Sequence, residues 1–108
     1  MRVRRSYGSW NYSTVSIVND TTNVVVVSDC VGNECTSEDL PLRVAPAGHY
    51  DNQAACGATG SNMTSWRLLN PRGQLIGYIA VDSPRKRDGL VFNVSAASPN
   101  RSTPTPPR

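Results

Sequence analysis

The chain has 108 residues, of which 38% are hydrophobic and 18% are charged, and its formal net charge is +3. This length fits one domain with a thin core, and no stretch approaches the roughly 18 apolar residues that would span a bilayer. The positive charge lies at the ends, because residues 10–98 hold six basic and eight acidic side chains. We therefore predict neither a nucleic-acid-binding fold nor a transmembrane segment.

The N-terminal part of the chain predicts a flexible arm followed by a β-hairpin. Residues 1–12 are polar and basic, and we expect them to form the arm. Residues 14–18 alternate polar and apolar side chains, and residues 24–28 are mostly valine, so both segments predict strands. Residues 19–23 between them are Asn, Asp and Thr, which favour turns. The two strands are therefore expected to pair as a hairpin.

Two further strands are predicted before the middle of the chain. Residues 40–45 alternate leucine and valine with other side chains. Pro41 indicates an edge strand or the start of a strand, because proline donates no backbone hydrogen bond. A Pro-Ala-Gly turn follows at 46–48, and residues 49–55 then predict a fourth, polar strand.

The C-terminal half predicts three more strands. Residues 65–69 form the fifth, and its Trp66 is expected in the core because of its large apolar area. The sequence Asn-Pro-Arg-Gly at 70–73 matches a type I turn and leads into a sixth strand at 74–81. Residues 90–95 alternate apolar and polar side chains and predict the seventh.

Seven short strands at roughly eight-to-twelve-residue spacing predict an all-β, antiparallel β-sandwich with an immunoglobulin-like or cupredoxin-like layout. We place this domain at residues 13–97. The remaining segment, 98–108, is rich in Pro, Ser, Thr and Arg. Prolines without apolar partners bury too little apolar surface to offset the conformational entropy that is lost on folding. We therefore expect this segment to be a disordered tail.

Three cysteines, Cys30, Cys35 and Cys56, lie in one stretch of the chain. Gly32 and Asn33 can form a turn within a polar loop that brings Cys30 and Cys35 together. We expect a disulfide between them, which would stabilise the fold by about 2 kcal/mol. A bridge from Cys30 to Cys56, and three reduced thiols in a cytoplasmic protein, are the alternatives.

The same cysteines and the chain's one histidine also compose a complete tetrahedral zinc set: Cys30, Cys35, His49 and Cys56. The spacing weakens this hypothesis, since only two of these ligands are close in sequence. A blue-copper site requires two histidines, which the chain lacks. A Cys56–His49 dyad is conceivable if both lie at one end of the same strand, but a surface His49 is favoured. We predict no cofactor, with zinc as the alternative.

A basic loop, Arg85, Lys86 and Arg87, falls between the sixth and seventh predicted strands. It is a candidate contact loop, although Asp82 and Asp88 flank it and a solvated loop tip is the favoured interpretation. The sequence contains no phosphate loop and no dinucleotide-binding fingerprint, and we predict no catalytic residues.

Short runs between residues 15 and about 95 carry a resemblance: Val-Asn-Asp-Thr-Thr at 18–22, four valines at 24–27, the Cys30 and Cys35 pair, Leu-Arg-Val-Ala-Pro-Ala-Gly at 42–48, Trp-Arg-Leu at 66–68, Pro-Arg-Gly at 71–73 and Leu-Ile-Gly-Tyr at 75–78. They resemble a group of small actinobacterial secreted or membrane-anchored proteins of unknown function, each with one predicted β-sandwich. The resemblance implies an extracytoplasmic β-sandwich and no particular activity. Tyr78 stands where that group would have a further cysteine, which leaves Cys56 without a partner.

Together these features predict a non-enzymatic β-sandwich that serves as an interaction or structural module with a protein partner. We expect it outside the cytoplasm or at the cell surface, although no signal peptide is visible, and a cytoplasmic location is the alternative. Strand edges and the loops at one end are the expected contact surfaces. The alternative functions are a zinc-binding domain, a virion or cell-surface assembly component, and a thiol enzyme that uses Cys56.

Overall fold

The structure, a computed structural model, describes residues 12–32, 35, 38–55, 63–82 and 87–108. Within these ranges the chain forms seven strands and one short 3₁₀ turn. The elements in chain order are β1 (Tyr12–Val18), β2 (Val25–Gly32), β3 (Leu42–Val44), β4 (His49–Ala55), β5 (Met63–Leu69), β6 (Leu75–Asp82), β7 (Leu90–Asn93) and the 3₁₀ turn Val94–Ala96. No helix in the described part of the chain is long and apolar enough to cross a membrane.

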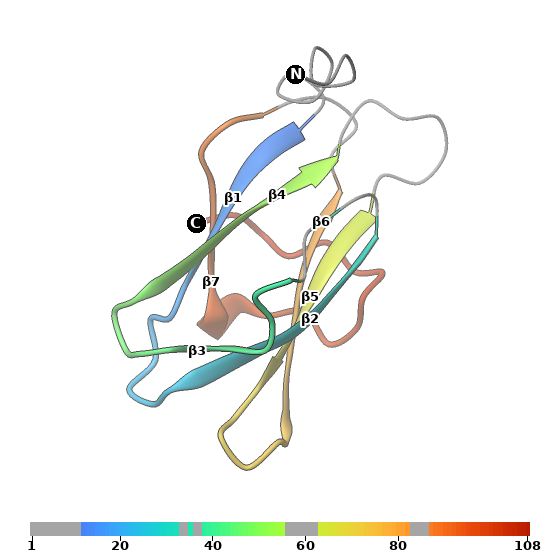
Figure 1. Cartoon of the computed structure of the whole chain (residues 1–108). Coiled ribbons are helices and arrows are strands. Elements are labelled where there is room, and N and C mark those ends of the chain that lie inside the picture. The colour runs from blue at the N-terminus through green and yellow to red at the C-terminus, as the bar shows by residue number, and fades with distance from the viewer. Residues whose placement is uncertain (1–11, 33–34, 36–37, 56–62, 83–86) are drawn as a thin grey trace.

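The strands form two sheets that face each other as a β-sandwich (Figure 1). One sheet has the order β4-β1-β7 and the other the order β3-β2-β5-β6. This arrangement confirms the predicted all-β, seven-stranded sandwich. The one parallel pair among the described strands is β1 with β7, whereas every other pair is antiparallel.

The predicted hairpin of the first two strands is wrong, because β1 and β2 lie in different sheets. The side chain of Asn19 is fully buried and donates hydrogen bonds to the carbonyl oxygens of Asn23 at 2.8 Å and Val44 at 2.9 Å. The backbone N–H of Ala47 also bonds to the Asn19 carbonyl. These contacts carry the chain from one sheet to the other. A turn-forming composition does not distinguish such a crossing from a hairpin.

The core lies between the sheets and consists of the inward side chains of every strand. Trp66, Leu68, Ile79 and Val27 have no exposed surface, which confirms the predicted core position of Trp66. The core cluster comprises Val15, Ile17, Val25, Val27, Val44, Tyr50, Ala54, Trp66, Leu68, Ile79, Val81, Phe92 and Val94. Their burial is the main source of the fold's stability.

A β-bulge in β2 decides which side chains of this strand face inward. The pairing of β2 with β5 shifts register between Val27 and Asp29. Val25 and Val27 are buried before the bulge, and Cys30 lies opposite the buried Trp66 after it. Without the extra residue, strict alternation would turn Asp29 toward the core. The predicted polar loop around Cys30 is therefore wrong, since β2 continues to Gly32.

The predicted disordered tail is also wrong. Residues 98–108 contact the edges of β6 and β7, and both Ser98 and Thr105 are 4% exposed. The domain therefore extends beyond residue 97 to the end of the chain. Composition alone predicts disorder, because the partners of this segment are backbone groups far away in sequence. Of the predicted N-terminal arm, residues 1–11 lie outside the described residues, and Tyr12 begins β1.

Candidate interaction surface

The strand β4 lies at the edge of the smaller sheet. Among the described residues it pairs only with β1, in an antiparallel register that runs along all seven of its residues. The backbone N–H of Gln53 donates to the side-chain oxygen of the adjacent Asn52, at 2.7 Å. An edge of this length offers backbone donors and acceptors to an additional strand.

The outer face of the same strand is polar. Alternation along β4 buries Tyr50 and Ala54 against the core and exposes His49, Asp51 and Gln53. In the register with β1, Asp51 lies opposite Ser16, Gln53 opposite Thr14 and His49 opposite Val18. We call the free edge of β4 together with the outward side chains of β4 and β1 the β4 surface.

Asp51 is the charged centre of the β4 surface. One of its carboxylate oxygens lies 3.0 Å from Nδ1 of His49, and both side chains are more than half exposed. A hydrogen bond from Ser16 lowers the pKa of Asp51 most, and the contact with His49 lowers it further, while partial burial opposes both. Exposed ion pairs stabilise a fold little, so the arrangement orders the surface more than it strengthens the domain.

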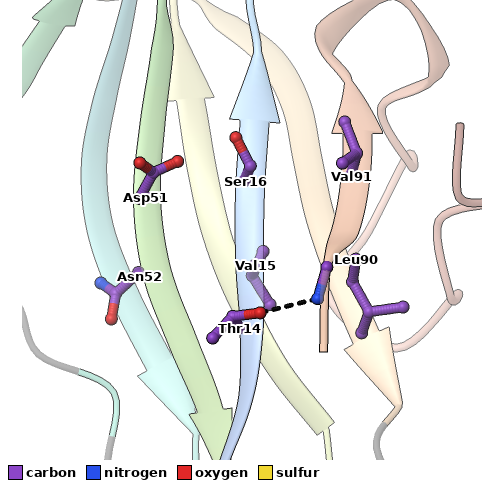
Figure 2. A pocket seen from close by; sticks show the side chains of 8 residues that line it. Thr14, Val15, Ser16, Asp51, Asn52, Leu90 and Val91 are labelled. Atoms are coloured by element: carbon purple, nitrogen blue, oxygen red, sulfur yellow. Dashed lines mark hydrogen bonds between the residues drawn. The ribbon is translucent and has the colours of Figure 1, made fainter. Parts of the chain in front are cut away.

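Two shallow hollows flank Asp51 and Asn52, which line both of them. The first, of about 340 Å³, lies across the three strands of the smaller sheet, as Figure 2 shows, and is lined by Thr14, Val15, Ser16, Asp51, Asn52, Gly89, Leu90 and Val91. At its margin the backbone N–H of Gly89 donates to Thr14 Oγ1 at 2.7 Å. The second hollow, of about 300 Å³, lies beside Asp39, Tyr50 and Gln53. Such hollows can accept single side chains of a partner.

Tyr50 connects β4 to the loop before β3. Its hydroxyl accepts a hydrogen bond from Asn52 at 2.7 Å and donates one to Asp39 at 3.3 Å. Burial raises the pKa of Tyr50, and the negative charge of Asp39 raises it further. The phenol therefore remains protonated at neutral pH and acts as a fixed donor that holds the second hollow in shape.

The carboxylate of Asp51 connects polar side chains of β1 and β4 on the β4 surface. Here the hydroxyl of Ser16 bonds to Asp51, and the imidazole of His49 bonds to the same carboxylate. The three side chains thus form one hydrogen-bonded group across β1 and β4.

Cys30 and Cys35 form the predicted disulfide, with an S–S distance of 2.08 Å and Cα atoms 6.2 Å apart. In this bridged state neither sulfur is the thiolate that zinc binds, and the zinc hypothesis stays a prediction. His49 instead pairs with Asp51 on the outer face. Cys56 lies outside the described residues, and the described part of the chain holds no group of three metal-ligating side chains.

The Cys56–His49 dyad required both residues at one end of a strand. His49 begins β4 and Ala55 ends it, so these two residues are about 20 Å apart along the extended chain. Cys56 lies outside the described residues, so the dyad stays a prediction. The favoured interpretation of His49 as a surface residue is confirmed by its 61% exposed side chain.

Of the predicted contact loop, only Arg87 falls within the described residues, and Arg85 and Lys86 lie outside them. The backbone N–H of Arg87 donates to Ser13 Oγ at 2.7 Å, and its guanidinium donates to the Asp82 carbonyl at 3.0 Å. Arg87 is therefore held against β1 and β6.

Sequence reasoning named His49 but missed Ser16 and Asp51. The predicted strand at 49–55 implies that His49 and Asp51 share one face, whereas the strand beside them was identified only by the structure. Comparisons with protein family models, curated proteins and solved structures give no match for this chain.

Proposed function

We propose that this protein is a non-enzymatic β-sandwich module that works outside the cytoplasm and binds a protein partner through the β4 surface. The observation that carries the proposal is an asymmetry between the strand edges. Residues 98–108 bond to β6 and β7, whereas β4 has no partner beyond β1 in the described part of the chain. The edge strand β3 also pairs with one strand only, but it has three residues against the seven of β4. The longer edge of β4 is the side at which another strand can be added.

The chemistry of the β4 surface supports a protein as the partner. An extended segment paired with β4 would find backbone donors and acceptors along the edge and a hollow on each side for its own side chains. Asp39 and Asp51 lie in these hollows and favour a segment with basic or hydrogen-bond-donating side chains. Strand addition of this kind combines affinity from the backbone with selectivity from the side chains.

The disulfide supports a location outside the cytoplasm. Bridges between cysteines persist in oxidising compartments and are rare where thiols are kept reduced. The Cys30–Cys35 bridge lies within and just beyond β2, where its half-buried sulfur atoms pack against the core cluster. Such a structural bridge is typical of a small secreted or surface domain.

Site-specific crosslinking tests the proposal. A photoreactive amino acid is placed at Gln53, on the β4 surface, and in a matched control at Arg72, which is exposed on the distant β5–β6 turn. Both full-length proteins are illuminated in an envelope extract of the native host. We expect one defined protein adduct from Gln53 that Arg72 does not give, and that the Asp51→Lys substitution abolishes. Adducts that are equal at both positions, or absent from Gln53, would contradict the proposal.

The same experiment distinguishes an assembly component from a module with a separate partner. If the Gln53 adducts are multiples of the chain's own mass, then β4 joins copies of this protein, and the virion or cell-surface assembly alternative replaces the proposed function. Light scattering of the purified chain over a range of concentrations provides an independent measure, since a strict monomer argues against assembly.

A further inference from the structure

The C-terminal segment, residues 98–108, forms the C-terminal strap, which occupies the edge of β6 as an added strand would. Tyr78 and Ser98 exchange two backbone hydrogen bonds, at 2.9 Å and 2.7 Å. Two residues further along β6, the N–H of Thr105 bonds to the Ala80 carbonyl at 2.8 Å, and the N–H of Ala80 bonds to Thr105 Oγ1 at 2.9 Å. The strap thus satisfies four backbone groups of β6 that would otherwise lie open.

Thr105 is the first anchor of the strap. Its hydroxyl accepts from the Ala80 N–H, lies 2.6 Å from Ser98 Oγ and donates to the Tyr78 carbonyl at 3.2 Å. The residue is 4% exposed, so these bonds form away from water. A side chain without a hydroxyl would leave the N–H of Ala80 buried and without this acceptor, which is costly.

Arg101 is the second anchor, and it reaches across the outer face of the larger sheet. One guanidinium nitrogen contacts both carboxylate oxygens of Asp29, at 2.8 Å and 3.0 Å, and the other donates to Ser65 Oγ at 3.0 Å. The guanidinium carbon lies 4.9 Å from the centre of the Tyr78 ring, within the range of a cation–π contact. Arg67 also forms an ion pair with Asp29, at 3.3 Å.

The surface beneath the strap is shaped for close contact. Ser65 and Ala80 point outward from the sheet but are 3% and 0% exposed. At Gly77 an added Cβ would lie 2.9 Å from the Ser98 carbonyl oxygen, so only glycine permits this approach. Further along, a hollow of about 170 Å³ is lined by Pro104 and Pro107 of the strap and by the core residues Val81 and Phe92.

We propose that the β6 edge is a peptide-binding site that recognises an arginine followed four residues later by a threonine, and that it accepts the C-terminal strap of a second copy of this chain in place of its own. The recognition elements are Asp29, Ser65 and Tyr78 for the arginine and the backbone of β6 for the threonine. This inference is independent of the β4 surface.

Exchange between copies follows from how the strap is attached. Its covalent link to the sandwich is through Ala97, and its non-covalent contacts with β2, β5, β6 and β7 would be the same for a strap from another molecule. The chain's own strap competes at an effective concentration in the millimolar range, so a second strap enters only when the first is weakened or the protein is concentrated.

The test uses the full chain with both anchors removed, Arg101→Ala and Thr105→Ala, labelled for NMR, and a synthetic peptide with the sequence of residues 98–108. The peptide is expected to shift the amide signals of Tyr78 and Ala80 in this variant, and to leave them unchanged in the wild-type chain, whose edge is occupied. A peptide that carries the same two substitutions is expected to bind at least about tenfold more weakly.

Two further substitutions in the acceptor examine the arginine contact. Asp29→Asn is expected to weaken binding of the unmodified peptide by about tenfold as well. Glu38→Gln removes a negative charge from an exposed loop residue and should leave binding unchanged. If the double variant does not fold, the Arg101→Ala single variant is the acceptor, since the Arg101 side chain is 30% exposed and its loss opens no core cavity. The proposal is overturned if the acceptor that folds shows no binding up to about 1 mM peptide, or if both peptides bind equally.

Discussion

Asp20 joins the loop after β1 to the 3₁₀ turn after β7. Its two carboxylate oxygens accept hydrogen bonds from the backbone N–H of Ser95, at 2.9 Å, and from the Ser95 hydroxyl. These bonds, the hydroxyl first, lower the pKa of Asp20, with a small opposing effect of burial. A carboxyl whose pKa is lower in the folded than in the unfolded chain stabilises the fold while it is ionised.

We predict that Asp20→Asn lowers the melting temperature by a few degrees near neutral pH, because the charged acceptor is lost. This deficit should shrink as the pH falls below about 3.9, the ordinary aspartate pKa, because the unfolded wild-type chain then becomes protonated at Asp20. It should disappear below the lowered pKa of folded Asp20, where the folded wild type is protonated too. Thermal unfolding followed between about pH 7 and pH 2 measures it. Ser95→Ala should give a similar deficit, whereas Asp82→Asn, at an exposed position, should not. A deficit that persists unchanged at the lowest pH contradicts this assignment.

At the scale of elements, the bulge in β2 sets the direction of both the cysteine that forms the disulfide and the aspartate that the strap contacts. It shifts the alternation so that Cys30 turns toward Trp66, while Asp29 turns outward to meet Arg67 and Arg101. One additional residue in a strand therefore supplies both the inner bridge and the outer ion pairs. Without the bulge, the side chains that follow it in β2 would point to the opposite faces of the sheet.

The disulfide itself is expected to contribute about 2 kcal/mol to the free energy of unfolding, because it closes a short loop with a sequence separation of five. Urea unfolding of the wild-type chain with and without a reducing agent measures this contribution. The double variant Cys30→Ala with Cys35→Ala should unfold at a lower urea concentration and show no response to the reductant. If the wild-type chain is equally stable in both conditions, the bridge does not brace the fold.

At the scale of the whole molecule, the strap places part of the chain's positive charge beside a carboxylate. Arg101, one of the two arginines in the last ten residues, is neutralised by Asp29. The segment 10–98 remains slightly acidic, and the excess of positive charge resides in the first nine residues. Affinity for nucleic acid depends on how many phosphates a basic surface can neutralise together.

We therefore predict that the full chain shows no saturable binding to duplex DNA below about 100 µM at physiological salt. Fluorescence anisotropy of a labelled duplex measures this binding. The Asp29→Asn variant, which leaves Arg101 and Arg67 without their carboxylate, serves as a more basic comparison. Tight binding by the wild-type chain would show that the distribution of charge does not exclude a nucleic-acid partner.

Much of the secondary structure was predictable because its signals are local. The alternation of residues 14–18 and 90–95 reflects strands with one buried face, and β1 and β7 lie there, although β7 gives way to the 3₁₀ turn at Val94. The turn at 70–73 is confirmed by the bond from the Gly73 N–H to the Asn70 carbonyl at 2.9 Å. The disulfide was predictable for the same reason, since its cysteines are close in sequence.

By itself the sequence determined the number of strands, the all-β class and the Cys30–Cys35 bridge, because alternation, turn chemistry and short spacing act between neighbouring residues. The tertiary structure alone decided that β1 and β2 occupy different sheets, that Ser16 and Asp51 meet, and that the last residues close the β6 edge. These features depend on backbone and side-chain partners far apart along the chain. Their pairing is set by which arrangement of strands buries the common core, and no local pattern records that choice.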